Sequence, residues 1–282
     1  MGAIEQTTAI EIKETRISLS QAGKGESLLF LHGNPGSRKD FSSLFDDFDA
    51  DRYRFFIPDR PGHMSSEELL NDNSDPWLDA DLFAEFIDRK CDGRTVLVGY
   101  SMGCYVACKI ALRFPEKVRG IVMLAPFLIP DTAGEKPSSL PEMARGAIIG
   151  TALGILMPLF AQNKMQQHLE RVFAPGKVNE DYLNTWLPRY TRFESLMAVI
   201  TDKNAMLRSM KEVHERIPEI KCPVQVVIGD GDKICSPERQ LGLITEKLPA
   251  ANIVHLADAG HSLNLSHPLD CLKAIDALFA RL

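Results

Sequence analysis

A serine with small residues on both sides is the first candidate for chemistry. Ser101 stands in Gly99-Tyr100-Ser101-Met102-Gly103, directly after an apolar run. The glycines two positions either side of it, Gly99 and Gly103, suit a sharp strand-to-helix turn that exposes the hydroxyl. Such a hydroxyl becomes a nucleophile only when a neighbouring base takes its proton. Because the pattern is common by chance, its partners decide its meaning.

Two later segments carry the side chains that would activate this hydroxyl. His261 follows Asp258-Ala259-Gly260, and Asp232 ends the run that leads from Ile228. In a catalytic triad, the imidazole takes the serine proton, and the carboxylate fixes the imidazole tautomer and stabilises its positive charge. We therefore expect Ser101 to be the nucleophile, His261 the general base, and either Asp232 or the neighbouring Asp230 the orienting acid.

The elements that must position these residues are apolar runs that alternate with amphipathic helical patterns. Unbroken apolar runs are typical of parallel strands covered on both faces, and they occur at residues 27–31, 53–57, 95–98, 120–124 and 224–228. The alternation predicts an α/β fold, a mostly parallel twisted sheet with helices on both faces. Carboxyl ends of such strands face a common crevice, so the three side chains are expected to converge there.

The start of the predicted fold and its middle differ from this alternation of strands and helices. Alternating residues 8–20 predict an antiparallel hairpin at the sheet edge. Residues 127–218 are almost wholly helical, with Pro and Gly between the helices. We therefore expect a core domain formed by 1–126 and 219–282, and an inserted helical cap, or lid, formed by 127–218.

A second loop adds to the case for acyl transfer. Leu31-His32-Gly33-Asn34-Pro35-Gly36-Ser37 directly follows an early apolar strand. With this loop, the serine turn and the chain order Ser, Asp, His, the sequence resembles the α/β-hydrolase family over about residues 25–126 and 222–282. The resemblance implies an oxyanion hole made by the backbone N–H groups of Asn34 and Met102, the residue after the nucleophile.

The resemblance also bears on the choice of acid and on one turn. The family places its carboxylate three residues after a strand-end glycine, which favours Asp232 over the neighbouring Asp230. Asp131, after an earlier strand, is a more distant alternative. Residues 57–65 resemble a DxPGxGxS turn of the family, with Met64 where a glycine is common, a departure that is expected to affect a turn with positive φ but no catalytic role.

Composition narrows the class of protein. The formal net charge is −6, and no Lys/Arg cluster is long enough to follow a phosphate backbone, so nucleic acid is not an expected partner. The six cysteines are scattered and are interpreted as reduced core thiols. The first residues lack a secretory pattern, which favours the cytoplasm. No histidine spacing matches a metal motif, and His63, His168 and His214 are interpreted as surface residues, so neither metal nor cofactor is expected.

The cap contains an apolar stretch that points to the substrate. Residues 146–161 carry no charge, with Gly146, Gly150 and Gly154 at every fourth place. The stretch is too short for a membrane span. Three interpretations remain, a tightly packed cap helix, an apolar lid over an acyl pocket, or a surface for peripheral lipid contact. All three favour an apolar substrate.

These observations predict a serine hydrolase that cleaves a carboxylic ester or thioester with a hydrophobic acyl group through an acyl-enzyme on Ser101. Haloalkane dehalogenases and epoxide hydrolases have similar loops but use an aspartate nucleophile, so Ser101 disfavours them. Carbon–carbon bond hydrolases and cofactor-free perhydrolases stay open, as does a ligand-binding signalling protein that retains the triad. A thioesterase acting on acyl carriers would use basic cap residues, for which the candidates are Lys164, Arg171, Arg189 and Arg192.

Overall fold

The computed structural model describes residues 6–67, 75–130 and 135–282, and it confirms the predicted α/β class. Within these residues, eight strands form one sheet in the order β1-β2-β4-β3-β5-β6-β7-β8. The strands are β1 (Gln6–Ile12), β2 (Thr15–Gly23), β3 (Glu26–Leu31), β4 (Tyr53–Pro58), β5 (Thr95–Tyr100), β6 (Val118–Leu124), β7 (Val224–Gly229) and β8 (Asn252–Leu256). Pairing is parallel from β4 to β8 and antiparallel for β1–β2 and β2–β4, so the expected edge hairpin is present.

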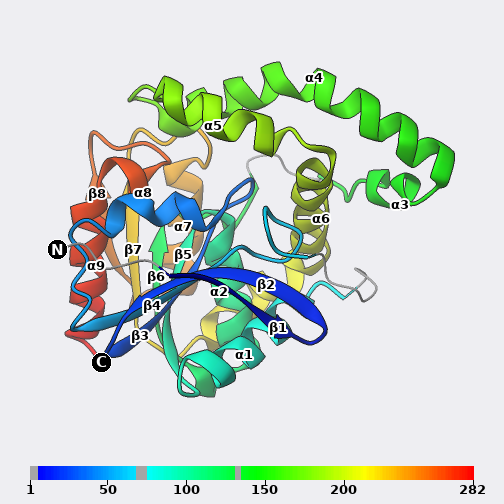
Figure 1. Cartoon of the computed structure of the whole chain (residues 1–282). Helices are drawn as coiled ribbons and strands as arrows, with labels where there is room; N and C mark the ends of the chain where they lie inside the picture. The colour runs from blue at the N-terminus through cyan, green and yellow to red at the C-terminus, as the bar shows by residue number, and fades with distance from the viewer. Residues whose placement is uncertain (1–5, 68–74, 131–134) are drawn as a thin grey trace.

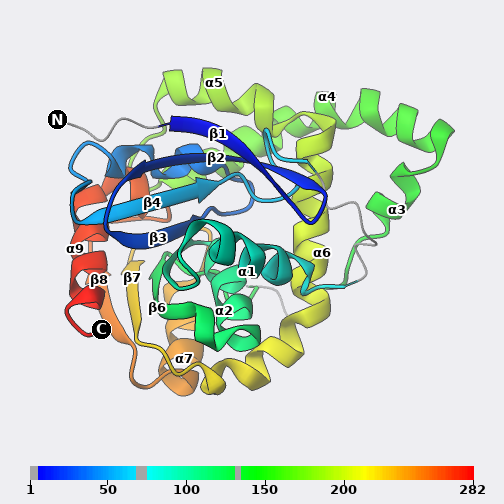
Figure 2. The same ribbon diagram turned by 60° about the horizontal axis from the view of Figure 1, so that its bottom comes forward.

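Helices cover both faces of the sheet (Figures 1 and 2). One face packs against α1 (Leu78–Lys90), α2 (Met102–Arg113) and α7 (Pro237–Lys247). The other packs against the 3-10 helix η1 (Arg38–Leu44), α8 (Leu263–Ser266) and α9 (Pro268–Phe279). Two short 3-10 turns, η2 (Pro115–Lys117) and η3 (Ile217–Glu219), precede β6 and β7.

The central strand shows how sequence produces this layering. All six residues of β5 are buried. Successive side chains of a strand point to opposite faces, so Leu97 belongs to the apolar cluster on the α2 side, while Val96 and Val98 belong to the cluster on the α9 side. An unbroken apolar run is therefore the pattern that this position requires, and it carries Ser101 at its carboxyl end.

Between β6 and β7, the described residues form four α-helices, namely α3 (Leu140–Ala144), α4 (Ala147–Phe173), α5 (Glu180–Tyr190) and α6 (Phe193–Arg216). Figure 1 shows α4 and α5 across one end of the sheet, with α6 along its side. The later part of α6 joins the core, because Met206 and Val213 pack in the same apolar cluster as α2. The division of the chain into a core and a cap at residues 127 and 218 stays a prediction.

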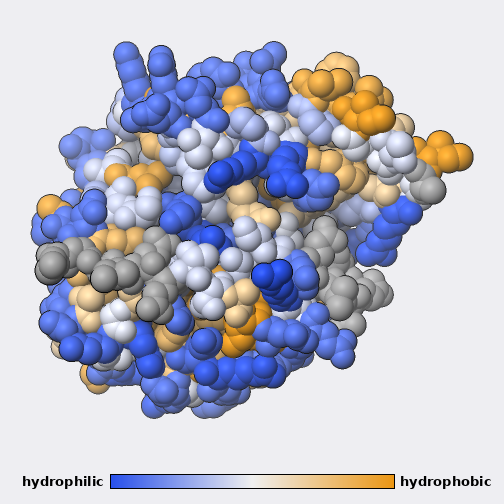
Figure 3. Space-filling model, in the orientation of Figure 1, coloured by the Kyte–Doolittle hydropathy of each residue, from blue (hydrophilic) through white to orange (hydrophobic). Residues whose placement is uncertain are grey.

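The apolar stretch of α4 does not pack as a buried helix. Ile148 is 87% and Phe160 75% exposed, and the outer end of the cap is apolar in Figure 3. Of the three spaced glycines, only Gly150 approaches another segment closely, since a Cβ there would lie 2.3 Å from the carbonyl oxygen of Ala144. The expectation of a tightly packed helix is therefore wrong for this stretch. Across the described ranges, no helix has both the length and the hydropathy to span a membrane.

Candidate active site

Ser101 occupies the turn between β5 and α2 with a strained backbone. Its φ is 52° and its ψ −120°, a left-handed conformation that residues other than glycine rarely adopt. Three backbone hydrogen bonds hold it. Its N–H donates to Leu124 O at 3.0 Å, and its carbonyl accepts from the N–H groups of Cys104 at 3.0 Å and Phe127 at 3.2 Å. The hydroxyl thus projects from the end of a fully packed strand at the start of a helix.

Close packing explains the two glycines of this turn. A Cβ at Gly103 would lie 1.9 Å from the carbonyl oxygen of Leu31, and one at Gly99 would lie 2.6 Å from the backbone of Cys104. Real Cβ contacts are longer than either distance. Helix α2 can therefore lie against β3, with Ser101 at its start, only if both positions lack a side chain.

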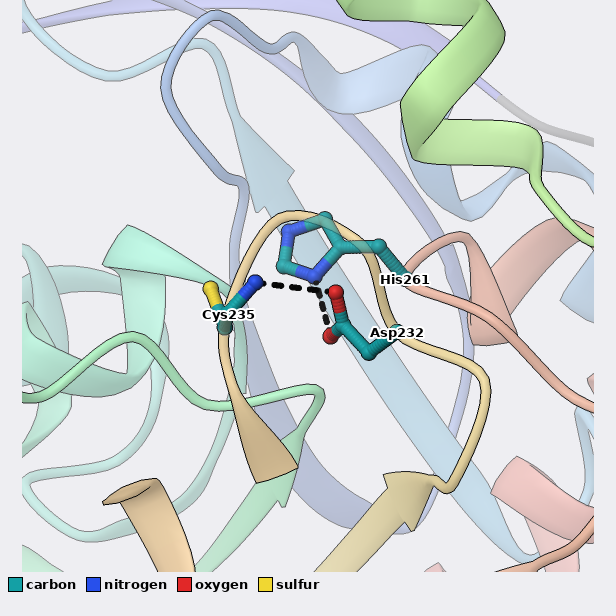
Figure 4. A group of neighbouring side chains, drawn as sticks. All are labelled: Asp232, Cys235 and His261. Atoms are coloured by element: carbon teal, nitrogen blue, oxygen red, sulfur yellow. Dashed lines mark hydrogen bonds and ion pairs between the residues drawn. The ribbon is translucent and has the colours of Figure 1, made fainter. Parts of the chain in front are cut away.

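The three side chains expected to form a triad meet at this turn. His261 Nε2 lies 2.9 Å from Ser101 Oγ, and His261 Nδ1 lies 2.7 Å from Asp232 Oδ2. The second carboxylate oxygen accepts the N–H groups of Ile234 at 2.7 Å and Cys235 at 2.9 Å. Figure 4 shows Asp232 between the imidazole and the backbone of Cys235. These bonds orient the carboxylate toward the ring, and the ring toward the hydroxyl.

The alternative acids are placed differently. Asp230 is exposed and pairs with His255 Nδ1 at 3.0 Å, away from the serine. Asp131 lies outside the described residues. The geometry therefore favours Asp232, which is buried at the end of β7.

Asp232, Cys235 and His261 also have potential ligand atoms within 4.8 Å of one another. Two of these atoms, Asp232 Oδ2 and His261 Nδ1, already bond each other. The cluster is therefore organised as an acid–base pair.

The loop after β3 lies against the nucleophile. A Cβ at Gly33 would lie 3.2 Å from Cβ of Ser101, so the chain entering Asn34 passes directly beside the serine. Met102 is the first residue of α2, where backbone N–H groups have no partner within the helix. Asn34 follows the glycine that lies beside Ser101, and Met102 is the next residue after Ser101 in the chain, so their role as oxyanion donors stays a prediction.

A small cavity with a mixed polar and apolar lining lies beside Tyr100, the residue before Ser101, where the core meets α4 and α5. It measures about 20 Å³, room for roughly one water molecule. Its polar lining comes from Asp40, Tyr100, His168, Tyr190 and Asn264. Burial raises the pKa of Asp40 to about 7. Burial, followed by the proximity of His261 and Arg171, lowers the pKa of His168 to about 4.

Some histidines differ from their expected surface positions. His63 is buried and contacts Asp202 of α6, and His168 lines the cavity beside Tyr100. His214 bonds the carbonyl oxygen of Leu128 at 2.7 Å. No local pattern signals these contacts, because each partner is distant in sequence. For Asp40, Ser37-x-x-Asp40 is a capping-box signature that identifies the start of η1 but not the cavity that the carboxyl lines.

The structure also shows the surroundings of Met64 and of the basic cap residues that the sequence singled out. Met64 has a positive φ of 48°, so the turn keeps this conformation without the glycine that is common there. Arg171 donates to the carbonyl oxygen of Lys233 at 2.5 Å, and the guanidinium of Arg189 lies over the ring of Trp186. Arg192 lies 3.7 Å from Glu194. These contacts give three of the four basic candidates local structural partners.

Known proteins share both the sequence pattern and the fold. A family model described as "alpha/beta hydrolase fold" matches residues 26–268. A pimeloyl-[acyl-carrier protein] methyl ester esterase from Aeromonas salmonicida (strain A449) is 25% identical over 276 residues, which is 92% of this chain and 97% of that protein. A 2-hydroxy-6-oxononadienedioate/2-hydroxy-6-oxononatrienedioate hydrolase from Burkholderia vietnamiensis (strain G4 / LMG 22486) is 27% identical over 90% of this chain and 87% of its own. The crystal structure of Cfl2 wild-type from Burkholderia cenocepacia has the same fold, with a TM-score of 0.79 at 20% identity, over 99% of this chain and 96% of that one.

Proposed function

Since this chain belongs to the α/β-hydrolase family, we propose that it is a serine hydrolase that cleaves carboxylic esters or thioesters with an apolar acyl group. One observation carries the proposal, the continuous hydrogen-bonded path from Ser101 through His261 to Asp232. The similarity to esterases and other hydrolases supports ester hydrolysis as the reaction class.

In the proposed reaction, His261 Nε2 takes the Ser101 proton while Oγ attacks the substrate carbonyl carbon. The Asp232 carboxylate accepts a hydrogen bond from His261 Nδ1–H and stabilises the imidazolium. The N–H groups of Asn34 and Met102 receive the developing oxyanion, a contribution of about 3–4 kcal/mol for each donor. The imidazolium then protonates the leaving oxygen or sulfur, and water activated by His261 releases the acyl group.

The preference for apolar acyl groups rests on apolar side chains of α4 that lie close to Tyr100, the residue before the proposed nucleophile. Leu169, Val172 and Phe173 of α4 line the cavity beside Tyr100. Charged acyl groups would lose hydration against these walls, whereas alkyl chains would gain from burial. Hydrolysis of nitrophenyl esters of increasing chain length tests this preference. We expect kcat/KM to rise from acetate to medium chains, and a steady fall from acetate onward contradicts the proposal.

The same panel separates the alternatives when Ser101→Ala is its control. A signalling protein would show slow turnover that the substitution leaves unchanged. A carbon–carbon bond hydrolase or a perhydrolase would use the same serine but would hydrolyse the esters and thioesters poorly. We expect rapid turnover of the esters, and its complete loss in Ser101→Ala.

We also propose a cellular location and a lipid contact for the protein. No disulfide joins any two of the six cysteines, all of which lie in the described part of the chain, and this supports a reducing compartment such as the cytoplasm. We further propose peripheral lipid contact by the exposed face of α4, without insertion, because residues 143–169 contain no acidic side chain, although the whole chain is acidic. Sedimentation with anionic phospholipid vesicles tests this contact, and Phe160→Ser is expected to weaken it.

A further inference from the structure

A buried arginine holds the loop that leads to the proposed oxyanion donor. Arg60 is only 2% exposed. Its Nε donates to the carbonyl oxygen of His32 at 3.0 Å, and its Nη2 donates to that of Gly33 at 2.9 Å. Two consecutive carbonyls immediately before Asn34 are therefore fixed by one planar guanidinium.

The histidine of this loop adds a third bond to the same residue. His32 Nε2 accepts the backbone N–H of Arg60 at 2.8 Å, while His32 Nδ1 lies 2.9 Å from Gly33 O. Burial and then the charge of Arg60 hold the pKa of His32 well below its ordinary value. The neutral ring can thus accept at Nε2 and donate from Nδ1, as both bonds require.

The carboxylate that pairs with Arg60 comes from the cap. Asp202 Oδ2, on α6, lies 2.6 Å from Arg60 Nη2 and 2.9 Å from His63 Nε2. Burial opposes ionisation of Asp202, but Arg60 and His63 outweigh it and hold the pKa of this carboxyl far below its usual range. A buried guanidinium that loses such a partner is left as an uncompensated charge and tends to move.

A second bond links the same turn of α6 to the loop itself. Asn34 Nδ2 donates to the carbonyl oxygen of Val199 at 2.9 Å, and Val199 lies three residues before Asp202. Since 3.6 residues make one helical turn, both anchors belong to one turn of the helix. The loop beside Ser101 is thus held from the core by Arg60 and from the cap by Val199 and Asp202.

We infer that Asp202 is a positioning residue that acts through Arg60 to hold the loop of His32, Gly33 and Asn34 in place. The packing of α6 against the core would then control the rate of acylation. This inference rests on the proposed function of Ser101 and of the Asn34 N–H. It extends that function, because it makes a cap carboxylate, distant in sequence from the triad, a determinant of kcat. Displacement of a catalytic group by about 1 Å can cost a rate factor on the order of 100.

The test compares Asp202→Asn with Glu212→Gln. Both residues lie on α6, and Glu212 also links the helix to the core, by accepting Trp77 Nε1–H at 3.2 Å, but does not touch the loop. We expect Asp202→Asn to slow labelling by an alkyl fluorophosphonate and to lower kcat, each by about tenfold or more, with KM changed less than about twofold. Asp202→Glu should restore part of the rate, and Glu212→Gln should match the unmodified protein.

A double-mutant cycle with Asn34→Ala checks that the effect passes through the loop. That substitution keeps the backbone N–H but removes the bond to Val199. If both residues act on one loop position, their effects on the labelling rate should be strongly non-additive. Additive effects overturn the inference. If Asp202→Asn does not fold, Asn34→Ala alone decides, since an unchanged labelling rate in that variant also overturns it.

The failure of this inference differs from failure of the proposed function. If the unmodified protein does not react with the fluorophosphonate, the proposed function is wrong and the inference falls with it. If the unmodified protein reacts and Asp202→Asn reacts equally fast, only the role of Asp202 is wrong. Equal losses of activity in Asp202→Asn and Glu212→Gln would also contradict it, because they would indicate a general weakening of α6.

Discussion

At the residue scale, the strained backbone of Ser101 is what makes its hydroxyl available. A residue with such φ and ψ values costs of the order of 1–3 kcal/mol, so the surrounding structure must compensate. The bonds from Ser101 to Leu124, Cys104 and Phe127 supply this restraint. The same turn places the hydroxyl 2.9 Å from His261 Nε2. Ser101 therefore combines a strained backbone, the hydrogen bonds that hold this backbone in place, and the hydroxyl that faces His261.

Exchanging the two neighbouring aspartates tests which one orients His261. We expect Asp232→Asn to lower kcat by about 10³–10⁴, because an amide no longer fixes the tautomer or stabilises the imidazolium. Asp230→Asn, the matched control, should leave kcat within about twofold, since Asp230 pairs with the exposed His255. Similar losses in both variants would contradict the assignment. Steady-state kinetics on one soluble ester measures both.

The buried carboxyl of Asp40 predicts a pH-dependent stability. Burial raises its pKa from an ordinary 3.8 to about 7. The folded state therefore keeps a proton that the unfolded state releases between about pH 4 and pH 7, so the Asp40 contribution to the free energy of unfolding falls as the pH rises through that window. It is fully present below the unfolded pKa and is lost above about pH 7.

Asp40→Asn keeps the size of the side chain and an acceptor oxygen but removes this titration. We expect its free energy of unfolding, measured in urea at about pH 4.5 and about pH 8, to fall less with rising pH than that of the unmodified protein. Between the two pH values, the free energy of unfolding should change by up to about 4 kcal/mol more in the unmodified protein than in Asp40→Asn. Parallel pH profiles for the two proteins would show that Asp40 titrates normally.

Single residues could be predicted where their sequence neighbours carry the signal. Ser101, His261 and Asp232 each follow an apolar strand with a glycine nearby, and the structure places them in one hydrogen-bonded path. Asp202 and His63 could not be predicted in this way. Their contacts join α6 to the turn after β4. The sequence of a helix does not indicate which side chains from distant parts of the chain will contact it.

At the element scale, the site depends on how closely α2 lies to β3. Gly103 has no space for a Cβ, because Leu31 O would lie 1.9 Å from it. Strand β3 continues into the loop of Gly33 and Asn34, so any displacement of α2 from β3 also separates the two expected oxyanion donors. The packing of one helix on one strand therefore connects fold stability with catalysis.

Gly103→Ala tests this dependence, with Gly242→Ala as its control. Gly242 lies in α7, and an added Cβ would meet no atom within 4 Å apart from its chain neighbours and the backbone of its own helix. We expect Gly103→Ala to lower the free energy of unfolding by about 3 kcal/mol or more and to reduce activity strongly. Gly242→Ala should be neutral or stabilising by up to about 1 kcal/mol, from helix propensity. Urea denaturation and ester hydrolysis measure both effects, and equal stability of the two variants would contradict the packing argument.

The helices of the proposed cap were harder to anticipate than the strands. Residues 147–161 are helical as expected, but the sequence left open whether they are packed or exposed, because small residues at every fourth place suit both kinds of helix. The strands of the core carry a stronger signal. A strand buried on both faces needs an unbroken apolar run, as in β5 and β7, whereas a helix may direct its apolar side chains toward a core, a ligand or a surface.

At the scale of the whole molecule, the fold follows from the order of elements along the chain. Parallel strands from β4 to β8 bring their carboxyl ends to one edge, where Ser101, Asp232 and His261 meet despite about 160 residues of separation. The helices between β6 and β7 approach that edge, and His168 and Leu169 line the cavity beside Tyr100. The net charge of −6 agrees with a small-molecule substrate better than with a polyanion.

The central claim is that one serine of the molecule is activated for covalent acyl chemistry. Mass spectrometry of the proteolysed protein after treatment with paraoxon tests this claim directly. The account predicts one diethylphosphate adduct per chain, on the peptide that contains Ser101, and its absence in the His261→Ala variant. An adduct elsewhere, or an equally fast adduct on Ser101 when His261 is missing, would contradict it.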